Sequence, residues 1–343
     1  MRKALIGILV FFVIIFPVTN TALNTPWLTQ QLVRRAFGKF APRVVLKEFS
    51  IATQRYFWPS HFEFGGIKLG LEVNGKALDL ACSRLELDGF RIQNGSKEFD
   101  LWLDSTDAAF DLGRAQNARA DLKVVLPAKG GFVLQGPVSA QVLTWDRTSA
   151  EHVSAEFLGD DKGLYFDLLK GEAFSGSFVG GVDIFYTDPP AYSVMLALKD
   201  MDTEELAALS PQVVEQVNGR VVGQVKFNGA GNNLTDFLAD LSMPSGGRVN
   251  AAFLATLTQY LPTLSNYLPN SREKQKFEAL IKSGGKLTVE TLGFLVKNDS
   301  ARHLAAALSL ASKEANINWN LTYDIYVDGT WGDLLQSWQA IFK

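Results

Sequence analysis

Three histidines and a single cysteine are the residues of this sequence best suited to metal binding or nucleophilic catalysis. His61, His152 and His303 lie far apart along the chain, and Cys82 is the one cysteine. A structural zinc site needs about four ligands in one place, and an intramolecular disulfide needs a second thiol. The pattern therefore predicts no metal site and no catalytic residue, and it excludes an intramolecular disulfide.

Carboxylate pairs are the next candidates, because two acids in different environments can serve as general acid and general base. Asp160 adjoins Asp161, and Glu204 adjoins Glu205. Adjacent acids in a loop or a first helical turn are usually solvated, or they offset the helix dipole. The Gly-Ala-Gly segment 229–231 lacks the later glycine of a phosphate-binding loop, and the sequence holds no nucleophile elbow or zinc-protease motif. We expect a protein that is not an enzyme and that uses no cofactor.

The composition is that of a folded, β-rich protein. Of the 343 residues, 47% are hydrophobic and 20% are charged, which excludes a disordered chain. The net charge of −3 is unsuited to nucleic acid, whose phosphates require a basic protein surface. The aromatic residues (24 Phe, 7 Trp and 8 Tyr) favour β-strands. We therefore expect no nucleic-acid partner.

The amino terminus has the pattern of a membrane anchor. Arg2 and Lys3 precede an apolar, uncharged run from Ala4 to Val18. Counted as far as residue 23, the segment has about 20 residues, enough for one bilayer crossing. Basic residues before such a run keep the amino terminus in the cytoplasm. We predict a transmembrane helix at residues 1–23, with the remainder of the chain exported.

Cleavage of this segment as a secretory signal is the alternative. The nearest cleavage site, Asn20-Thr21-Ala22, places asparagine where a signal peptidase requires a small residue. We therefore favour an uncleaved anchor. The residues expected within the membrane are Leu5, Ile6, Ile8, Leu9, Val10, Phe11, Phe12, Val13, Ile14, Ile15 and Phe16.

One helix and then a long series of strands are expected after the anchor. Thr25-Pro26 is a typical helix start, and this helix either rests on the membrane surface or caps the end of a sheet. From Val44 to Leu198, apolar residues alternate with polar ones, and turn signals such as Asn74-Gly75 separate the runs. The segment Ile317–Val327 alternates most strictly of all. The pattern predicts a mainly antiparallel β architecture with roughly 15 or more strands.

Helices are expected again in the last third of the chain, as peripheral elements. Asp202 and Glu205 predict a capping box for a helix that runs to Leu209. Further helices are expected within residues 253–264, 271–283 and 331–342. A break near Asp200 divides the exported part into a β-rich region, residues 24–200, and a second β region with helices, residues 201–343.

Two stretches resemble the AsmA-like family of inner-membrane-anchored periplasmic envelope proteins. Residues 25–64 are similar to the start of that family, where an anchor leads to a short helix and then to a meander of strands. Residues 202–253 are similar to its C-terminal stretch, where a Gly-x-x-x-Gly strand precedes a Gly-x-Gly turn and a leucine-rich segment. The residues that carry this second match are Gly219, Gly223, Gly229, Gly231, Leu234, Leu238, Leu241 and Gly247.

The resemblance implies a fold and a location. It implies an elongated half-pipe of antiparallel β-strands, a β-taco-like groove, anchored in the inner membrane by a single crossing, with the bulk of the chain in the periplasm. It also implies a part in lipid transport or outer-membrane assembly. Phospholipid or another envelope lipid would then be a partner, together with other envelope proteins.

A physical argument concerns the same apolar face. Alternating strands ordinarily bury such a face in a closed core, whereas the predicted anchor and export, the length of the strands and the lack of catalytic motifs favour a groove. A sheet with one apolar face must cover that face. Helices or a second sheet can seal it as a closed core, or it can stay open as a groove that lipid chains fill. The candidate groove face consists of Ile67, Leu69, Leu71, Val73, Leu164, Phe166, Leu168, Val194, Leu196, Leu198, Val221, Val225 and Phe227.

Three classes of function follow from these observations. The first is a non-catalytic, inner-membrane-anchored periplasmic protein that handles lipid or helps assemble the outer membrane through an apolar β groove. The second is a structural or secretion-system adapter, similar in layout to the component GspN, whose sheet is a platform for other proteins. The third is a periplasmic enzyme with an unrecognised site. We favour the first.

Overall fold

The computed structural model describes residues 24–31, 44–57, 60–73, 76–110, 113–146, 148–206, 217–231, 233–250, 275, 278–279, 282–300, 303–313 and 317–326. The predicted anchor at residues 1–23 lies outside these ranges, as do the predicted helices at 253–264 and 331–342. Of the predicted helix at 271–283, the described residues 275, 278–279 and 282–283 are helical. Within the described ranges, no helix is long and apolar enough to cross a membrane.

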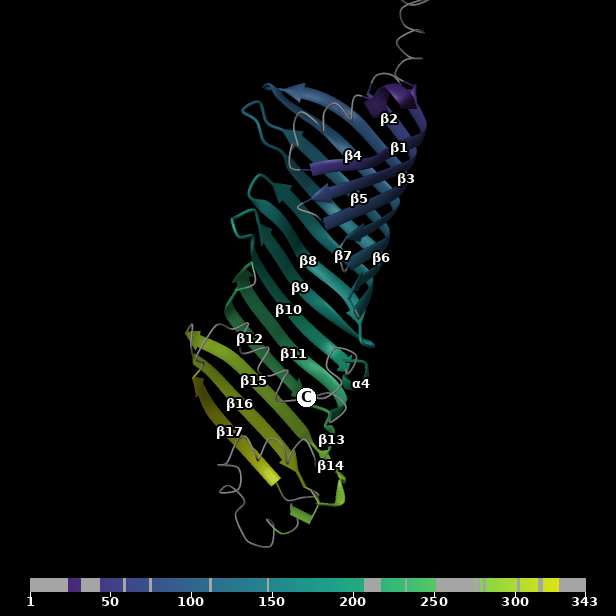
Figure 1. Cartoon of the computed structure of the whole chain (residues 1–343). Coiled ribbons are helices and arrows are strands. Elements are labelled where there is room, and N and C mark those ends of the chain that lie inside the picture. Colours follow the sequence, from purple (N-terminus) through teal and green to yellow (C-terminus); the bar gives the residue numbers. More distant parts are fainter. Residues whose placement is uncertain are drawn as a thin grey trace, which may run out of the picture. The chain divides into compact units, whose positions relative to one another are not determined.

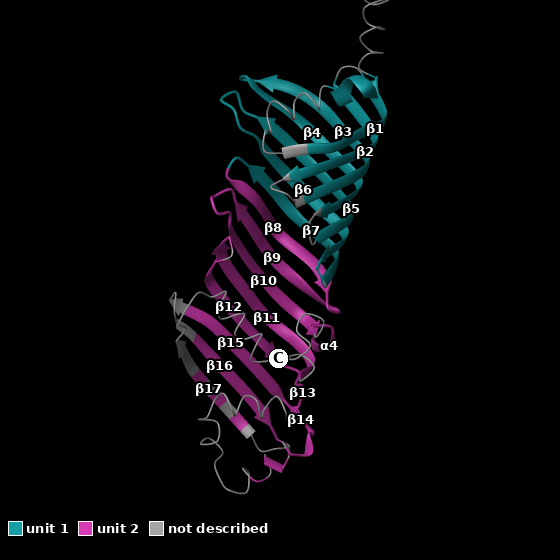
Figure 2. Cartoon of the chain, in the orientation of Figure 1, with its two compact units in different colours: residues 1–161 teal, residues 162–343 magenta. Residues whose placement is uncertain are grey.

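The fold is mainly β and antiparallel, as the alternating pattern predicts, and the sheet is open. Seventeen strands are described between Val44 and Tyr326, so the expected number of strands is confirmed. The chain divides into two compact units, Met1–Asp161 and Lys162–Lys343, which Figure 2 shows in different colours.

Unit 1 is an antiparallel meander in which each strand pairs with the next one in sequence. Its strands are β1 (Val44–Phe57), β2 (His61–Val73), β3 (Lys76–Gln93), β4 (Ser96–Phe110), β5 (Gly113–Leu126), β6 (Val133–Trp145) and β7 (Thr148–Asp160). Figure 1 shows these strands bent along their length.

A short helix at residues 26–31 lies against β1 of the same unit. The Gln30 side-chain amide donates a hydrogen bond to the Ile51 carbonyl at 3.3 Å. The Tyr56 backbone N–H donates to the Asn24 side-chain oxygen. The expected helix after Thr25 is therefore present in the described residues, and its contacts are with the first strand of the sheet.

Most strands of unit 2 also pair with the next strand in sequence. Its elements are β8 (Gly163–Ala173), β9 (Gly176–Phe185), β10 (Ala191–Asp202), α4 (Thr203–Leu206), β11 (Val217–Ala230), β12 (Asn233–Met243), β13 (Gly247–Asn250), β14 (Lys286–Val289), β15 (Thr291–Ser300), β16 (His303–Ser312) and β17 (Ile317–Tyr326). The exception is that β13 and β14 are inserted in the sequence between β12 and β15, which pair with each other. β13 instead pairs with the first residues of β11 and with β14.

The boundary between the units differs from the one expected near Asp200. The units divide between Asp161 and Lys162. Asp200 belongs to β10, which pairs with β9 on one side and with β11 on the other. A residue in an interior strand of a sheet cannot separate two compact units, so the compositional break near Asp200 marks the end of a strand instead.

Bulges interrupt many of the strands and bend them. Ser105 in β4 is one example, because its φ of 47° is left-handed and the register with β5 shifts between Leu103 and Thr106. A bulge of this kind inserts an extra residue, bends the strand and increases its twist. Residues with φ between 50° and 55° occupy the interior of β5, β7, β8 and β10: Asn117, His152, Leu168 and Asp200.

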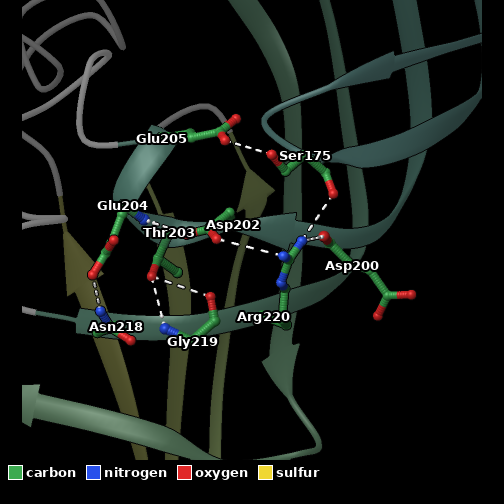
Figure 3. Close-up of polar contacts among 9 residues, drawn as sticks. All are labelled: Ser175, Asp200, Asp202, Thr203, Glu204, Glu205, Asn218, Gly219 and Arg220. Atoms are coloured by element: carbon green, nitrogen blue, oxygen red, sulfur yellow. Dashed lines mark hydrogen bonds and ion pairs between the residues drawn. The ribbon is translucent and has the colours of Figure 1, made fainter.

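The helix α4 is fixed to its neighbours by polar side chains, drawn in Figure 3. The Glu204 backbone N–H donates to a carboxylate oxygen of Asp202 at 2.8 Å, so Asp202 caps the helix as predicted. The other half of the predicted capping box is wrong, because Glu205 accepts a hydrogen bond from the Ser175 hydroxyl. In a capping box Glu205 would accept a hydrogen bond from the Asp202 N–H. That N–H instead donates to the Phe174 carbonyl at 2.8 Å.

Arg220 joins the same corner of the sheet together. Its guanidinium donates to the carbonyls of Ser175 at 2.8 Å and Asp200 at 2.9 Å. It also lies 3.6 Å from the Asp202 carboxylate. These contacts connect the β8–β9 turn, the end of β10 and β11 (Figure 3).

Gly223 lies where β11 and β12 approach each other closely. Its φ is +153°, and a Cβ built there would lie 1.9 Å from the Asp240 carbonyl oxygen. We expect Gly223→Ala to lower the free energy of unfolding by about 2–4 kcal/mol. The matched control is Gly181→Ala, whose Cβ would come no closer than 3.3 Å to another atom. That change should cost at most about 1 kcal/mol in urea unfolding, and equal losses for the two variants would contradict the register described here.

Candidate functional site

The residues best suited to metal binding or nucleophilic catalysis lie on separate strands. His61 begins β2, His152 forms the bulge of β7, and His303 begins β16. Cys82 in β3 is 2% exposed, and its thiol donates to the Arg84 carbonyl at 3.1 Å. In the part of the chain that the structure describes, no group of three or more His, Cys, Asp or Glu side chains is placed to hold a metal ion.

The feature that extends through unit 2 is an apolar face built from cross-strand pairs. Leu196 in β10 lies opposite Val225 in β11, which lies opposite Ala239 in β12. Ala239 lies opposite Val296 in β15. With Gly180 in β9 and Ala306 in β16 included, this row crosses six strands. At about 4.8 Å per strand, the row is about 24 Å wide.

Most residues predicted for the groove face in this unit share that row or the neighbouring ones. Val194 lies opposite Phe227. Leu198 lies opposite Gly223, and Val221 opposite Met201, one bulge further along β10. The structure thus brings Val194, Leu196, Leu198, Val221, Val225 and Phe227 onto one face of two paired strands.

Leu164 and Phe166 join this face, and Leu168 does not. Phe166 lies opposite Val182, which lies opposite Val194. Leu168 has a φ of 50° at a bulge, and its side chain is 71% exposed. Because the bulge reverses the alternation, Leu169 takes the position opposite Gly180. The prediction that Leu168 belongs to the groove face is therefore wrong. The two adjacent leucines, Leu168 and Leu169, were the sign in the sequence that the alternation is interrupted here.

Unit 1 has an apolar face of the same kind. Ile67 in β2 lies between Ile51 in β1 and Cys82 in β3. Leu69 lies opposite Phe49 and Leu80. The other predicted members follow along β2, where Leu71 lies opposite Leu46 and Leu78, and Val73 lies opposite Val44 and Lys76.

Sequence reasoning missed the larger part of both faces. In unit 1 the face includes buried Leu122 and Val124 of β5. In unit 2 it continues into β12, β15 and β16, with Phe237, Phe294 and Leu308 among its members. The alternation was present in these strands, but their neighbours in the sheet could not be assigned from the sequence.

These faces are only partly covered by the rest of the described chain. At one corner, Leu206 of α4 packs on Met201, Val221 and Met243, and Met201 and Met243 are only 3% and 2% exposed. Away from that corner, Leu196, Val225 and Phe227 are half-buried, whereas Ala239 and Val296 of the same row are 6% and 4% exposed. Among the described strands, every extensive contact joins hydrogen-bonded neighbours, except that of β14 with β16. The described strands therefore supply no second layer over the part of the face that β10 and β11 form.

The opposite face carries charged side chains, and several of them form ion pairs. In unit 1 the Arg119 guanidinium lies 2.9 Å from the Asp104 carboxylate, and the Lys123 ammonium lies 3.1 Å from Glu98. In unit 2 the Lys226 ammonium lies 2.7 Å from Asp236. Such a face is satisfied by water. The apolar face, in contrast, is the surface that calls for a partner.

The chain has no match among protein-family models, curated proteins or solved structures. The resemblance to the AsmA-like family therefore stays a prediction from the residues given above.

One carboxyl group of the polar face has a shifted pKa. Asp183 in β9 lies opposite Tyr165 and Ser193. Partial burial raises the pKa of Asp183 above the ordinary value of 3.8, and the nearby Asp167 carboxylate raises it further. The folded chain therefore binds this proton more tightly than the unfolded chain does. The resulting stability is fully present below pH 3.8 and is lost as the pH rises through the folded-state pKa.

We expect Asp183→Asn to raise the melting temperature near neutral pH, because the amide carries no charge to desolvate. Below the ordinary carboxyl pKa the two proteins should melt alike. Asp167→Asn is the matched control, and it should give a smaller gain because it removes only the repulsion. Thermal unfolding followed by circular dichroism across this pH range measures both effects. A gain for Asp183→Asn that is equal at acid and neutral pH would contradict the assignment.

Proposed function

We propose that this chain is a non-catalytic lipid-handling protein whose open apolar face forms a groove for acyl chains. In this proposal residues 1–23 anchor the chain in the inner membrane, the remainder lies in the periplasm, and the groove serves lipid transport or outer-membrane assembly. The observation that carries the proposal is the half-buried part of the row at Leu196 and Val225, over which no second described strand lies.

Curvature of the sheet supports a half-pipe. Each side chain of a flat single sheet stays substantially exposed on both faces, whereas on the concave face of a bent sheet neighbouring side chains converge. In unit 1, Cys82 is 2% exposed and Val124 is 4% exposed. The bulges at Ser105 and Asn117 bend the strands that carry this face. We take the apolar face to be the inside of the half-pipe.

The chemistry of the face matches an acyl chain. It presents branched aliphatic and aromatic side chains, and the ion pairs lie on the other side of the strands. Each methylene group that leaves water contributes about 0.8 kcal/mol. A lipid chain lying along the row would therefore gain stability without any specific polar contact, as a carrier of varied lipids requires.

The alternative hypothesis, a structural or secretion-system adapter, requires a protein segment on the same apolar face. A β-sheet platform for proteins would be covered by an amphipathic helix or strand of the partner. The two readings agree on which face is used and differ in the molecule that lies on it, so a covalent capture experiment separates them.

We expect photo-crosslinking amino acids at Leu196 and Val225 to capture phospholipid in cells. The matched controls are Ala197 and Gln224, which lie opposite each other in the same two strands and point to the other face. Those positions should yield no lipid adduct, because they face water. Mass spectrometry of the purified protein identifies the adducts. Protein adducts without lipid at Leu196 and Val225 would favour the adapter, and equal lipid capture at all four positions would contradict the groove.

A further inference from the structure

Large apolar side chains collect at one end of the strands of unit 1. Eleven such side chains are exposed in the described residues, and six belong to this end. We call them the apolar rim. Its members are Trp27 (64% exposed), Leu28 (36%), Phe57 (49%), Phe90 (49%), Ile92 (67%) and Leu126 (36%).

Hydrogen-bond, aromatic and ion-pair contacts connect the first part of the rim. Asn24 accepts a hydrogen bond from the Tyr56 N–H, which places the helix at 26–31 beside the end of β1. The rings of Phe57 and His61 are 5.5 Å apart. The His61 imidazole lies 3.6 Å from the Asp88 carboxylate in β3. These contacts lead from the helix across the ends of β1 and β2 to β3.

The register of the strands connects the second part. Asp88 accepts a hydrogen bond from the Gly89 N–H at 2.8 Å, next to Phe90. Ile92 then lies opposite Lys97 in β4, and Lys97 lies opposite Leu126 in β5. The members of the apolar rim therefore lie on the helix and at the same end of β1, β3 and β5. Figure 1 shows the helix and the first strands at the same end of unit 1.

We propose that the apolar rim lies in the interfacial layer of a lipid bilayer. Tryptophan is enriched in this layer, and phenylalanine and leucine are typical of the apolar face that interfacial segments bury there. The predicted anchor ends at residue 23, and the helix begins at residue 26. The two residues between them span at most about 11 Å. An anchored chain therefore holds Trp27 within reach of the membrane surface.

This proposal rests on the anchor of the proposed function and adds a second, separate contact with the membrane. It concerns the end of unit 1, whereas the groove concerns the apolar face of the strands. The proposal for the apolar rim can therefore be contradicted by experiment while the proposal for the groove is not. A protein surface, including a second copy of the chain, is the other occupant that would cover these residues, and the experiment below distinguishes it from lipid.

The test places an environment-sensitive fluorophore on single cysteines of the full chain. Native Cys82 is 2% exposed, so we expect it to stay unlabelled. Treatment of the unsubstituted protein with the same fluorophore is the control. The rim variants are Ile92→Cys and Phe57→Cys. The matched control is Trp145→Cys, which is 54% exposed and lies at the other end of β6, about 40 Å along the strands. Phe12→Cys reports whether the anchor is inserted.

Each labelled protein is reconstituted in vesicles of phosphatidylethanolamine and phosphatidylglycerol, with and without a lipid that carries a doxyl quencher on its acyl chain. We expect blue-shifted emission at positions 92 and 57, and quenching several-fold stronger than at position 145. A blue shift without quenching means that protein covers the rim, and it overturns the proposal. Quenching at position 12 together with none at 92 and 57 also overturns it, while leaving the anchor in place.

Discussion

Contact between apolar side chains on adjacent strands is the interaction on which both units depend. Backbone hydrogen bonds set the register, but they contribute little net free energy, because the unfolded chain bonds to water instead. The rows through Ile67 in unit 1 and through Val225 in unit 2 supply the burial that stabilises the sheets. The same rows make up the candidate binding face, so this protein draws its stability and its proposed function from one surface.

Curvature reconciles these two roles. An apolar face left uncovered would be a liability in a flat sheet. Bulges such as Asp200 in β10 bend the strands so that neighbouring side chains shelter one another. Paired charges such as Lys226 and Asp236 keep the outside soluble. The face can thus be apolar enough to hold a lipid chain and still belong to a folded protein.

The sequence predicted the periodic features and missed those that depend on distant partners. Alternation alone was enough to place Val194, Leu196 and Leu198 on one face of their strand, because period two is a local property. It failed at Leu168, where a left-handed residue reverses the alternation. Alternation carries no information on the boundary between the units or on the pairing of β12 with β15, since both are set by contacts between residues far apart in sequence. The tertiary partner of Glu205 was hidden for the same reason.

The central claim is that the apolar face is open at Leu196 and Val225, and a charge placed there tests it most directly. Leu196→Asp and Val225→Asp would place a carboxylate on half-buried positions of the row, and Val296→Asp would place one on the same row at a position that is 4% exposed. An unpaired buried carboxylate costs several kcal/mol, whereas a hydrated one costs about 1 kcal/mol. Urea unfolding of the lipid-free protein should therefore show that Val296→Asp unfolds it and that the other two variants stay folded, with losses of about 1–2 kcal/mol. Equal, severe losses at all three positions would mean a sealed core and would contradict the groove.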